Sequence, residues 1–251
     1  MSILHNASDV LRCFGTGCSD ITVTEVSTRL GLPKASASRL LKAMRDCGML
    51  EEIGGTRRHR PGRMMLDLAA AFRHSSGLIG RAGEVVAAAS RRFGHTGYIS
   101  LRDGFEVTAI ADFEGTNQLR VVSNIGRRLP AHACSTGRTL LARLPEAEVA
   151  RLYAGHPELE LLLSRLAQVR AEGFAVSTQE TTLGVEGIAI AVADPATDEV
   201  VSLCLVYPHT LVTPEERDEM IAMLAEGAGE IAASLGDAAF MQPLLKNRIP
   251  Q

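Results

Sequence analysis

The spacing of apolar residues near the start of the chain predicts short helices in succession. Residues 5–15 and about 22–30 carry apolar side chains at intervals of three and four, as one face of a helix does. Thr22 and Glu25 have the spacing of a capping box, which predicts that the second helix begins there. Gly31 suits the left-handed position after a helix end. Two short helices joined by a tight turn with glycine predict a helix-turn-helix, whose second helix follows Gly31.

That second helix lies within Leu32–Leu50 and has two different faces. Its apolar stripe consists of Ala37, Leu40, Leu41 and Met44. The side chains expected to contact DNA are small, hydroxyl-bearing or cationic: Lys34, Ala35, Ser36, Ser38, Arg39 and Lys42. A major groove accepts such a surface, because small residues allow close approach and Arg or Lys reach base edges and phosphates. Taken alone, this helix fits an ordinary surface helix with solvated charges equally well.

After Gly48 the pattern changes to that of a short hairpin. Residues 49–53 alternate as a strand does, and Gly54-Gly55 favour a tight turn. The returning strand is rich in cations, and we expect Arg57, Arg58 and Arg60 to hold the DNA backbone. A basic hairpin alone is more often a solvated loop. The ordered combination of helices, basic helix face and basic hairpin is more specific and favours a winged helix-turn-helix.

Apolar residues also recur on one side of residues 62–76. This pattern predicts a connecting helix that packs against a second copy of the chain, with packing onto its own domain as the alternative. Ser75-Ser76-Gly77 then break the pattern. We therefore expect a DNA-binding domain over 1–61, a linker helix over 62–77 and a second domain over 78–251.

The second domain alternates strand-like and helical stretches. The predicted strands, which indicate an antiparallel sheet, are 95–102, 105–112, 118–123, 174–179, 187–193 and 200–207. The predicted helices are 78–93, 136–144, 145–153, 158–172 and 213–235. The last fifteen residues are expected to be loosely ordered. This domain is long enough to bury a core and a pocket.

Charge is distributed unevenly along the 251 residues, although the net charge is only −3. Residues 34–63 hold eight Lys or Arg and three acidic residues, so this stretch carries +5 and the rest about −8. Such asymmetry indicates a basic binding module joined to an acidic body. The five cysteines are scattered without CxxC spacing, which favours a reducing compartment. With no signal-peptide pattern and no apolar run near ~20 residues, we expect a cytoplasmic protein that does not contact membranes.

Both halves together resemble the IclR-type family of bacterial transcriptional regulators. The resemblance rests on LGLPKASASRLLKAMRDCGML with the basic hairpin after it, on LPAHACSTGRTLLA and on GFAVSTQETTLGVEGIAIAVADP. It implies an α/β (α+β) chain whose winged helix-turn-helix binds a palindromic operator as a dimer. It further implies a GAF-like C-terminal sensor of a small metabolite, often a carboxylic acid, and a homodimer or dimer of dimers. We expect no cofactor.

By the same resemblance, an effector pocket maps onto several segments of the second domain. One is the helix start at Ser135, Thr136 and Gly137, where free N–H groups and the positive dipole end also suit an anion on physical grounds. The other implied positions are Gln118, Val121, Ser177, Glu180, Gly187, Cys204 and Val206. The family often has Cys where this chain has Gly187, and Ser-x-Ser-Gly where it has residues 204–207. That wall is therefore expected to be less polar.

Other chemistries fit the residues less well. An enzyme would use Cys134 as nucleophile, with its pKa lowered at a helix N-terminus, and His132 as base. Residues two apart in an extended loop need not face each other, and no third orienting group is evident. A redox-sensing Cys134 is a further alternative, but a small buried residue beside the pocket is favoured. A metal site from His95, His132, His209 and Glu180 lacks ligand spacing such as HxxxH.

The sequence thus predicts a DNA-binding transcriptional regulator without enzymatic activity. We expect a repressor controlled by a small metabolite, an organic acid, in the C-terminal domain. The alternative is a thiol- or small-molecule sensor that acts through protein contacts rather than DNA.

Overall fold

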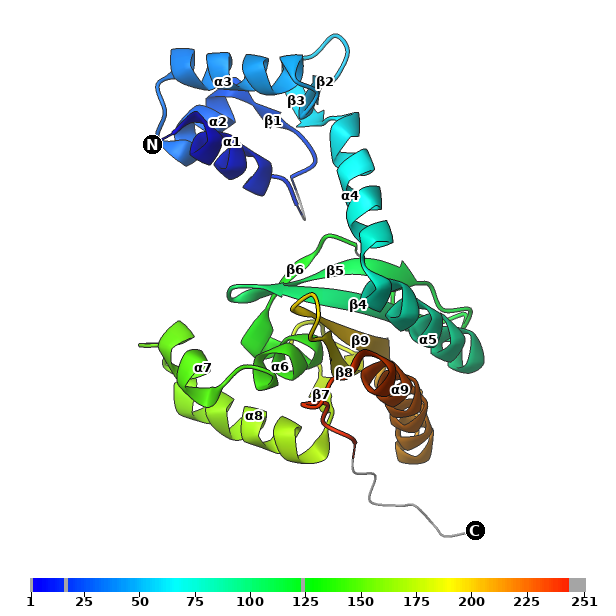
Figure 1. Ribbon diagram of the computed structural model, residues 1–251. Helices are drawn as coiled ribbons and strands as arrows, with labels where there is room; N and C mark the ends of the chain where they lie inside the picture. The colour runs from blue at the N-terminus through cyan, green and yellow to red at the C-terminus, as the bar shows by residue number, and fades with distance from the viewer. Residues whose placement is uncertain (1, 16–17, 123–124, 244–251) are drawn as a thin grey trace. The chain divides into compact units, whose positions relative to one another are not determined.

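The computed structural model describes residues 2–15, 18–122 and 125–243, and the chain divides into two compact units after Ser76 (Figure 1). Each unit has its own hydrophobic core. None of the described helices is both long and apolar enough to cross a membrane.

The first unit packs three helices around a small core that includes Val10, Val26 and Leu41. The helices are α1 (Ile3–Arg12), α2 (Val23–Leu30) and α3 (Lys34–Asp46). The predicted capping box at the start of α2 is confirmed, because the Thr22 side chain accepts from the Glu25 N–H and the Glu25 carboxylate accepts from the Thr22 N–H. Gly31 ends α2 with a φ of 64°, in the left-handed region as predicted.

A three-stranded antiparallel sheet completes this unit, with strand order β1-β3-β2. The expected hairpin is present as β2 (Leu50–Glu52) and β3 (Arg58–Pro61). The third strand, β1 (Ile21–Thr22), pairs with β3 and has no counterpart in the sequence prediction. Two residues are too few to show an alternating pattern. The chain then continues into α4 (Arg63–Ser75).

The second unit is built on a six-stranded antiparallel sheet of order β6-β5-β4-β9-β8-β7. Its strands are β4 (Thr96–Asp103), β5 (Glu106–Phe113), β6 (Arg128–Pro130), β7 (Ala175–Thr178), β8 (Val185–Asp194) and β9 (Glu199–Pro208). Helices α5 (Gly77–Phe93) and α9 (Pro214–Leu235) cover one face. On the other lie α6 (Ser135–Ala142), α7 (Glu146–Leu152) and α8 (Leu159–Glu172) (Figure 1). This arrangement agrees with the predicted antiparallel sheet flanked by helices.

One predicted strand is wrong. Residues 118–122 form no strand, and residue 123 lies outside the described part of the chain. The partner of β5 is instead β6, in a stretch outside the predicted strands and helices, which continues into the 3₁₀ helix η1 (Ala131–Ala133). The segment 118–122 is bound by hydrogen bonds from side chains instead. Thr96 Oγ1, for example, donates to the Val121 carbonyl at 2.5 Å. The segment 118–122 therefore has the apolar residues typical of a strand but does not pair with a neighbouring strand.

The expectation of a loosely ordered C-terminus is also wrong for part of its length. Asp237 is buried, and its carboxylate accepts from Arg143 Nη2 at 2.5 Å and from the Ala193 N–H at 2.9 Å. Residues 244–251 of that prediction lie outside the described residues. The segment after α9 is therefore fixed to the sheet at its beginning by a buried carboxylate.

Candidate functional site

The outer face of α3 is exposed and cationic. Its inner stripe is confirmed, because Ala37, Leu40, Leu41 and Met44 are all buried. Of the residues expected to contact DNA from this helix, Ser36 is half-buried and the rest are exposed: Lys34, Ala35, Ser38, Arg39 and Lys42. Among the described residues, no carboxylate forms an ion pair with the three cations of this set. Their charges are therefore uncompensated and face solvent.

The three wing arginines differ in their partners. Arg57 lies in the exposed turn, and no described residue forms an ion pair with it. Arg58 donates through Nε to Asp20, and its Nη2 lies 3.6 Å from Glu25 Oε1. Arg60 donates through Nε to Glu51 Oε1 at 2.6 Å. The pattern of residues 56–60 could not show the pairing with Asp20, because that residue lies 38 positions earlier in the chain.

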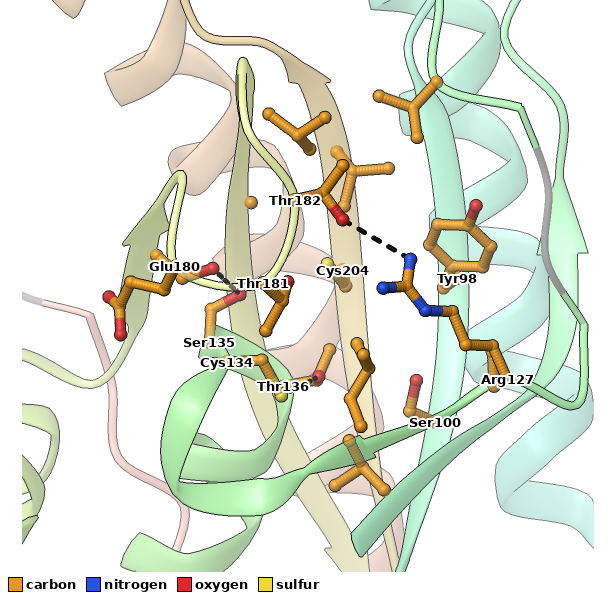
Figure 2. A pocket seen from close by; sticks show the side chains of 18 of the residues that line it. Tyr98, Ser100, Arg127, Cys134, Ser135, Thr136, Glu180, Thr181, Thr182 and Cys204 are labelled. Atoms are coloured by element: carbon orange, nitrogen blue, oxygen red, sulfur yellow. Dashed lines mark hydrogen bonds between the residues drawn. The ribbon is translucent and has the colours of Figure 1, made fainter. Parts of the chain in front are cut away.

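The second unit contains a cavity of about 330 Å³ between the sheet and the start of α6 (Figure 2). Most of its surface is apolar, with Val107, Ala109 and Val206 among the residues that line it. All six strands of the sheet contribute to it, together with the loop 180–182 and the segment that precedes β6. Because these segments are far apart in sequence, the cavity has no local sequence signature.

Polar groups lie at different ends of this cavity. Ser177 Oγ and Ser135 Oγ are 3.2 Å apart where β7 meets the start of α6. Arg127 reaches in from the segment before β6, and its Nη1 donates to Thr182 Oγ1 at 3.4 Å (Figure 2). Among the residues that the structure describes, this is the one hydrogen bond of the Arg127 guanidinium. The cavity therefore offers a pair of hydroxyls at one end and a cation at another.

The carboxylate that borders the cavity belongs to Glu180, and two arginines already bind it. Arg138 is buried and holds both carboxylate oxygens, Oε2 at 2.7 Å and Oε1 at 3.0 Å. Arg165 Nη1 lies 3.2 Å from Oε2. In Figure 2 the Glu180 carboxylate lies on the opposite side of the drawn residues from the Arg127 guanidinium. Among the described residues, Arg127 and Glu180 are the charged ones that line the cavity, and Glu180 is already compensated by Arg138 and Arg165, so Arg127 is the uncompensated charge there.

Most positions that the resemblance assigned to a pocket line this cavity: Val121, Ser135, Thr136, Ser177, Glu180, Gly187, Cys204 and Val206. Gln118 and Gly137 do not line it. Gln118 is exposed, and Gly137 is buried against η1, where an added Cβ would lie 2.1 Å from the Ala131 oxygen. That these residues contact an effector stays a prediction.

Four further lining residues, Tyr98, Ser100, Arg127 and Thr182, were not predicted to bind an effector. From the sequence, Tyr98 fits either a pocket-lining or a core position, and a core position is favoured. Arg127 and Thr182 lie in loops without periodicity, so no pattern in the sequence marks them.

The environment of Cys134 contradicts an activated thiol. Burial raises the pKa of Cys134, whereas the enzyme alternative needs a thiol whose pKa is lowered by the helix N-terminus; Cys134 is the small buried residue beside the pocket that the sequence favoured. The Cys134 Sγ instead caps α6 by accepting from the Gly137 N–H at 3.4 Å. The His132 ring packs against His156 and Tyr153, with centroids 4.8 and 5.8 Å away. Within the described residues, no group of three His, Cys, Asp or Glu side chains could hold a metal ion.

Comparison with known proteins assigns the chain to a family. Residues 70–233 match the model of the bacterial transcriptional regulator IclR C-terminal domain, and residues 4–54 match the IclR helix-turn-helix domain. The chain therefore belongs to the IclR family, and it is a DNA-binding transcriptional regulator whose N-terminal unit is a winged helix-turn-helix.

Named relatives extend over nearly the whole chain. The regulator XynR of Escherichia coli (strain K12) is 27% identical over 243 residues, 93% of this chain and 96% of the relative. The transcriptional repressor AllR of the same organism is 25% identical over 225 residues, 86% of this chain and 83% of the relative. Relatives named as regulators and repressors indicate a non-enzymatic family, as the sequence predicted.

Solved structures support the same fold. A putative IclR regulator from Silicibacter sp. TM1040 has a TM-score of 0.83 at 22% identity, covering 94% of this chain and 96% of its own. An IclR homolog from Microbacterium hydrocarbonoxydans, solved as a complex with 4-hydroxybenzoate, has a TM-score of 0.76 at 21% identity, covering 94% and 100%. At these identities the similarity establishes the fold.

Proposed function

We propose that this regulator is a repressor whose affinity for a palindromic operator is controlled by a small organic acid in the cavity of the second unit. One observation carries the proposal: a cationic, uncompensated helix face and a largely apolar cavity with an arginine at one end occur in one chain. The first suits the phosphate-rich surface of DNA, and the second suits a small anion with an apolar body. The name of AllR as a repressor supports the sign of regulation.

On the DNA side, α3 is the helix that would enter the major groove. Arg39 and Lys34 would reach bases or nearby phosphates, while Lys42 would hold the backbone. Arg57 is better placed than Arg58 to contact phosphates from the wing, because Arg58 already binds Asp20 and Glu25. Arg60 is intermediate, since its carboxylate partner Glu51 lies on the exposed hairpin.

On the effector side, the relative complexed with 4-hydroxybenzoate supports a carboxylic acid as the ligand class. A bound molecule changes DNA affinity only by its differential affinity for two states of the protein. The signal would pass through α4 (Arg63–Ser75), which lies within the linker expected over residues 62–77 between domains 1–61 and 78–251.

A second copy of the chain would complete the DNA-binding form. On α4, Leu68 and Phe72 lie one turn apart and are 57% and 48% exposed. Exposed apolar residues in register on a helix favour a partner helix over solvent. We therefore propose a homodimer, alone or as a dimer of dimers, that places two copies of α3 on the two halves of the operator.

A titration of the purified protein with fluorescent DNA tests this function. The probe is the DNA upstream of its own gene, and the control is a duplex of scrambled sequence. We expect tighter binding to the upstream DNA, steep weakening with salt and release by an organic acid. Equal affinity for both duplexes would contradict sequence-specific binding to an operator. It would favour the alternative that the protein acts through contacts with other proteins.

A further inference from the structure

We infer that Arg127 is the residue that binds the carboxylate of the effector, and that the Ser135–Ser177 hydroxyl pair binds a second oxygen of the same molecule. The ligand class is thus a monocarboxylic acid with an apolar body and a distal hydroxyl. The inference rests on the proposed function only in that a small organic acid occupies the cavity. It differs from the sequence prediction, which placed the anion at the start of α6.

Most hydrogen-bond donors of Arg127 have no partner among the described residues. A guanidinium carries five N–H donors, and within the described residues one of them bonds to Thr182 Oγ1 at 3.4 Å. That distance is long for a hydrogen bond, and its acceptor is neutral. A carboxylate would accept two parallel hydrogen bonds from the same group, which are shorter and stronger. Arg127 is therefore the cation at the cavity with unused capacity for an anion.

The other charged groups near the cavity already bind one another. Both oxygens of Glu180 are bound by Arg138, and Arg165 adds a third contact. Arg138 also donates to the Val176 carbonyl at 2.7 Å, so its guanidinium is occupied by structural contacts. An anion that entered the cavity would meet the positive Arg127 without having to break a buried ion pair.

The start of α6 is less suited to the carboxylate, because a side chain of this protein already caps it. Its Gly137 N–H is already capped by the Cys134 side chain, and Thr136 Oγ1 lies 3.3 Å from the same sulfur. Ser135 and Ser177 supply hydroxyls, which both donate and accept and so suit a neutral hydroxyl. Gly187 keeps space beside them, since an added Cβ would lie 3.2 Å from Ser135 Oγ and 3.5 Å from Ser177 Oγ.

Calorimetric titration of the full-length protein tests the carboxylate end. The probes are 4-hydroxybenzoate, 6-hydroxyhexanoate and the amide of each acid, which keeps the shape and loses the charge. We expect at least one acid to bind about 10- to 100-fold more tightly than its amide. Arg127→Gln should remove that difference, and Arg127→Lys should restore part of it, because a lysine keeps the charge without the two-pronged geometry.

A matched control is Arg128→Gln, which neutralises the adjacent arginine. Arg128 does not line the cavity and pairs with Glu106 at 3.0 Å. It should leave the acid–amide difference unchanged. Binding by neither acid, or a difference that survives Arg127→Gln in a protein with unchanged melting temperature, would overturn the inference.

The hydroxyl end has its own test. The Ser135→Ala, Ser177→Ala double variant should weaken 4-hydroxybenzoate several-fold and leave 4-methylbenzoate unaffected, whereas equal loss for both would contradict the assignment. DNA affinity measured on the same samples separates the two proposals. If the acid binds through Arg127 and DNA affinity does not change, the regulatory function fails and the ligand site stands.

Discussion

The two units present cations to their ligands in different ways. In the first unit, Lys34, Arg39 and Lys42 project from one helix into solvent. In the second, Arg127 is half-buried at a largely apolar cavity that several separate segments assemble. Solvent and salt screen exposed charges, so the helix face relies on many weak contacts with a highly charged partner. A half-buried guanidinium is screened less, so a single well-oriented contact contributes more.

The units also differ in how their charged groups stabilise the fold. In the first unit Arg58 joins the wing to α2 through Asp20 and Glu25 at a partly exposed site. In the second, Arg138 is buried and joins α6 to Glu180 at the end of β7. The difference predicts which substitutions harm stability and which harm binding.

The largest expected effect is that of Glu180→Ala on the second unit. It leaves the buried Arg138 guanidinium without its carboxylate, which destabilises a fold by about 3 kcal/mol. Urea unfolding of the full-length protein should show this loss. The control is Glu172→Ala, which removes a carboxylate whose hydrogen bond with Gln168 is exposed, and it should change little. Equal stability of the two variants would mean that the Arg138–Glu180 pair is not a structural contact of the second unit.

The next effect is on sequence-specific DNA binding. Arg39→Ala should weaken operator binding by ~1–3 kcal/mol, with a smaller effect on scrambled DNA, because a base contact carries specificity. Arg45→Ala on the same helix is the control, since Arg45 pairs with Glu52 at 2.9 Å. An equal loss for both duplexes would instead place Arg39 on the phosphates.

A smaller effect distinguishes the two wing arginines. Arg57→Ala should lower affinity for all duplexes and reduce the slope of log affinity against log salt by about 0.9, because one phosphate contact is lost. Arg58→Ala should leave the slope unchanged and lower the stability of the first unit, because it removes the contacts with Asp20 and Glu25. If Arg58→Ala reduces the salt slope and Arg57→Ala does not, Arg58 releases Asp20 and Glu25 to bind DNA.

The smallest expected effect is a difference between the two units in how their stability depends on pH. Burial lowers the pKa of His95 in the second unit, so below its ordinary value of about 6.5 the unfolded chain binds more protons and the stability of this unit falls. In the first unit, the Thr22 N–H holds the pKa of Glu25 below its usual value, so stability there is lost only in the more acidic range below about 4.5.

Thermal unfolding between these two pH values measures the difference. His95→Gln should make the stability of the second unit depend less on pH. The change in slope should be below about 1.4 kcal/mol per pH unit, which is the limit for one proton. A profile that is flat in the wild-type protein would contradict a neutral, buried His95.

The sequence predicted local features and missed the contacts between distant segments. The helix-turn-helix, the capping box at Thr22 and the buried stripe of α3 follow from short-range periodicity, so pattern alone predicts them. The strand β1, the pairing of Arg58 with Asp20 and the position of Arg127 depend on residues that fold together from far apart. The misplaced strand at 118–123 has the same cause, because strand composition does not determine which segment pairs with β5.

The most direct test of the whole account is the effect of a bound acid on DNA affinity in the wild-type protein and in Arg127→Gln. Operator binding is measured by fluorescence anisotropy with and without the acid that binds more tightly in calorimetry. The account predicts that the acid releases the wild-type protein from the operator, while Arg127→Gln binds the operator equally with and without it. Release of both proteins at the same acid concentration would contradict the role of Arg127, and release of neither would contradict control of DNA binding by this cavity.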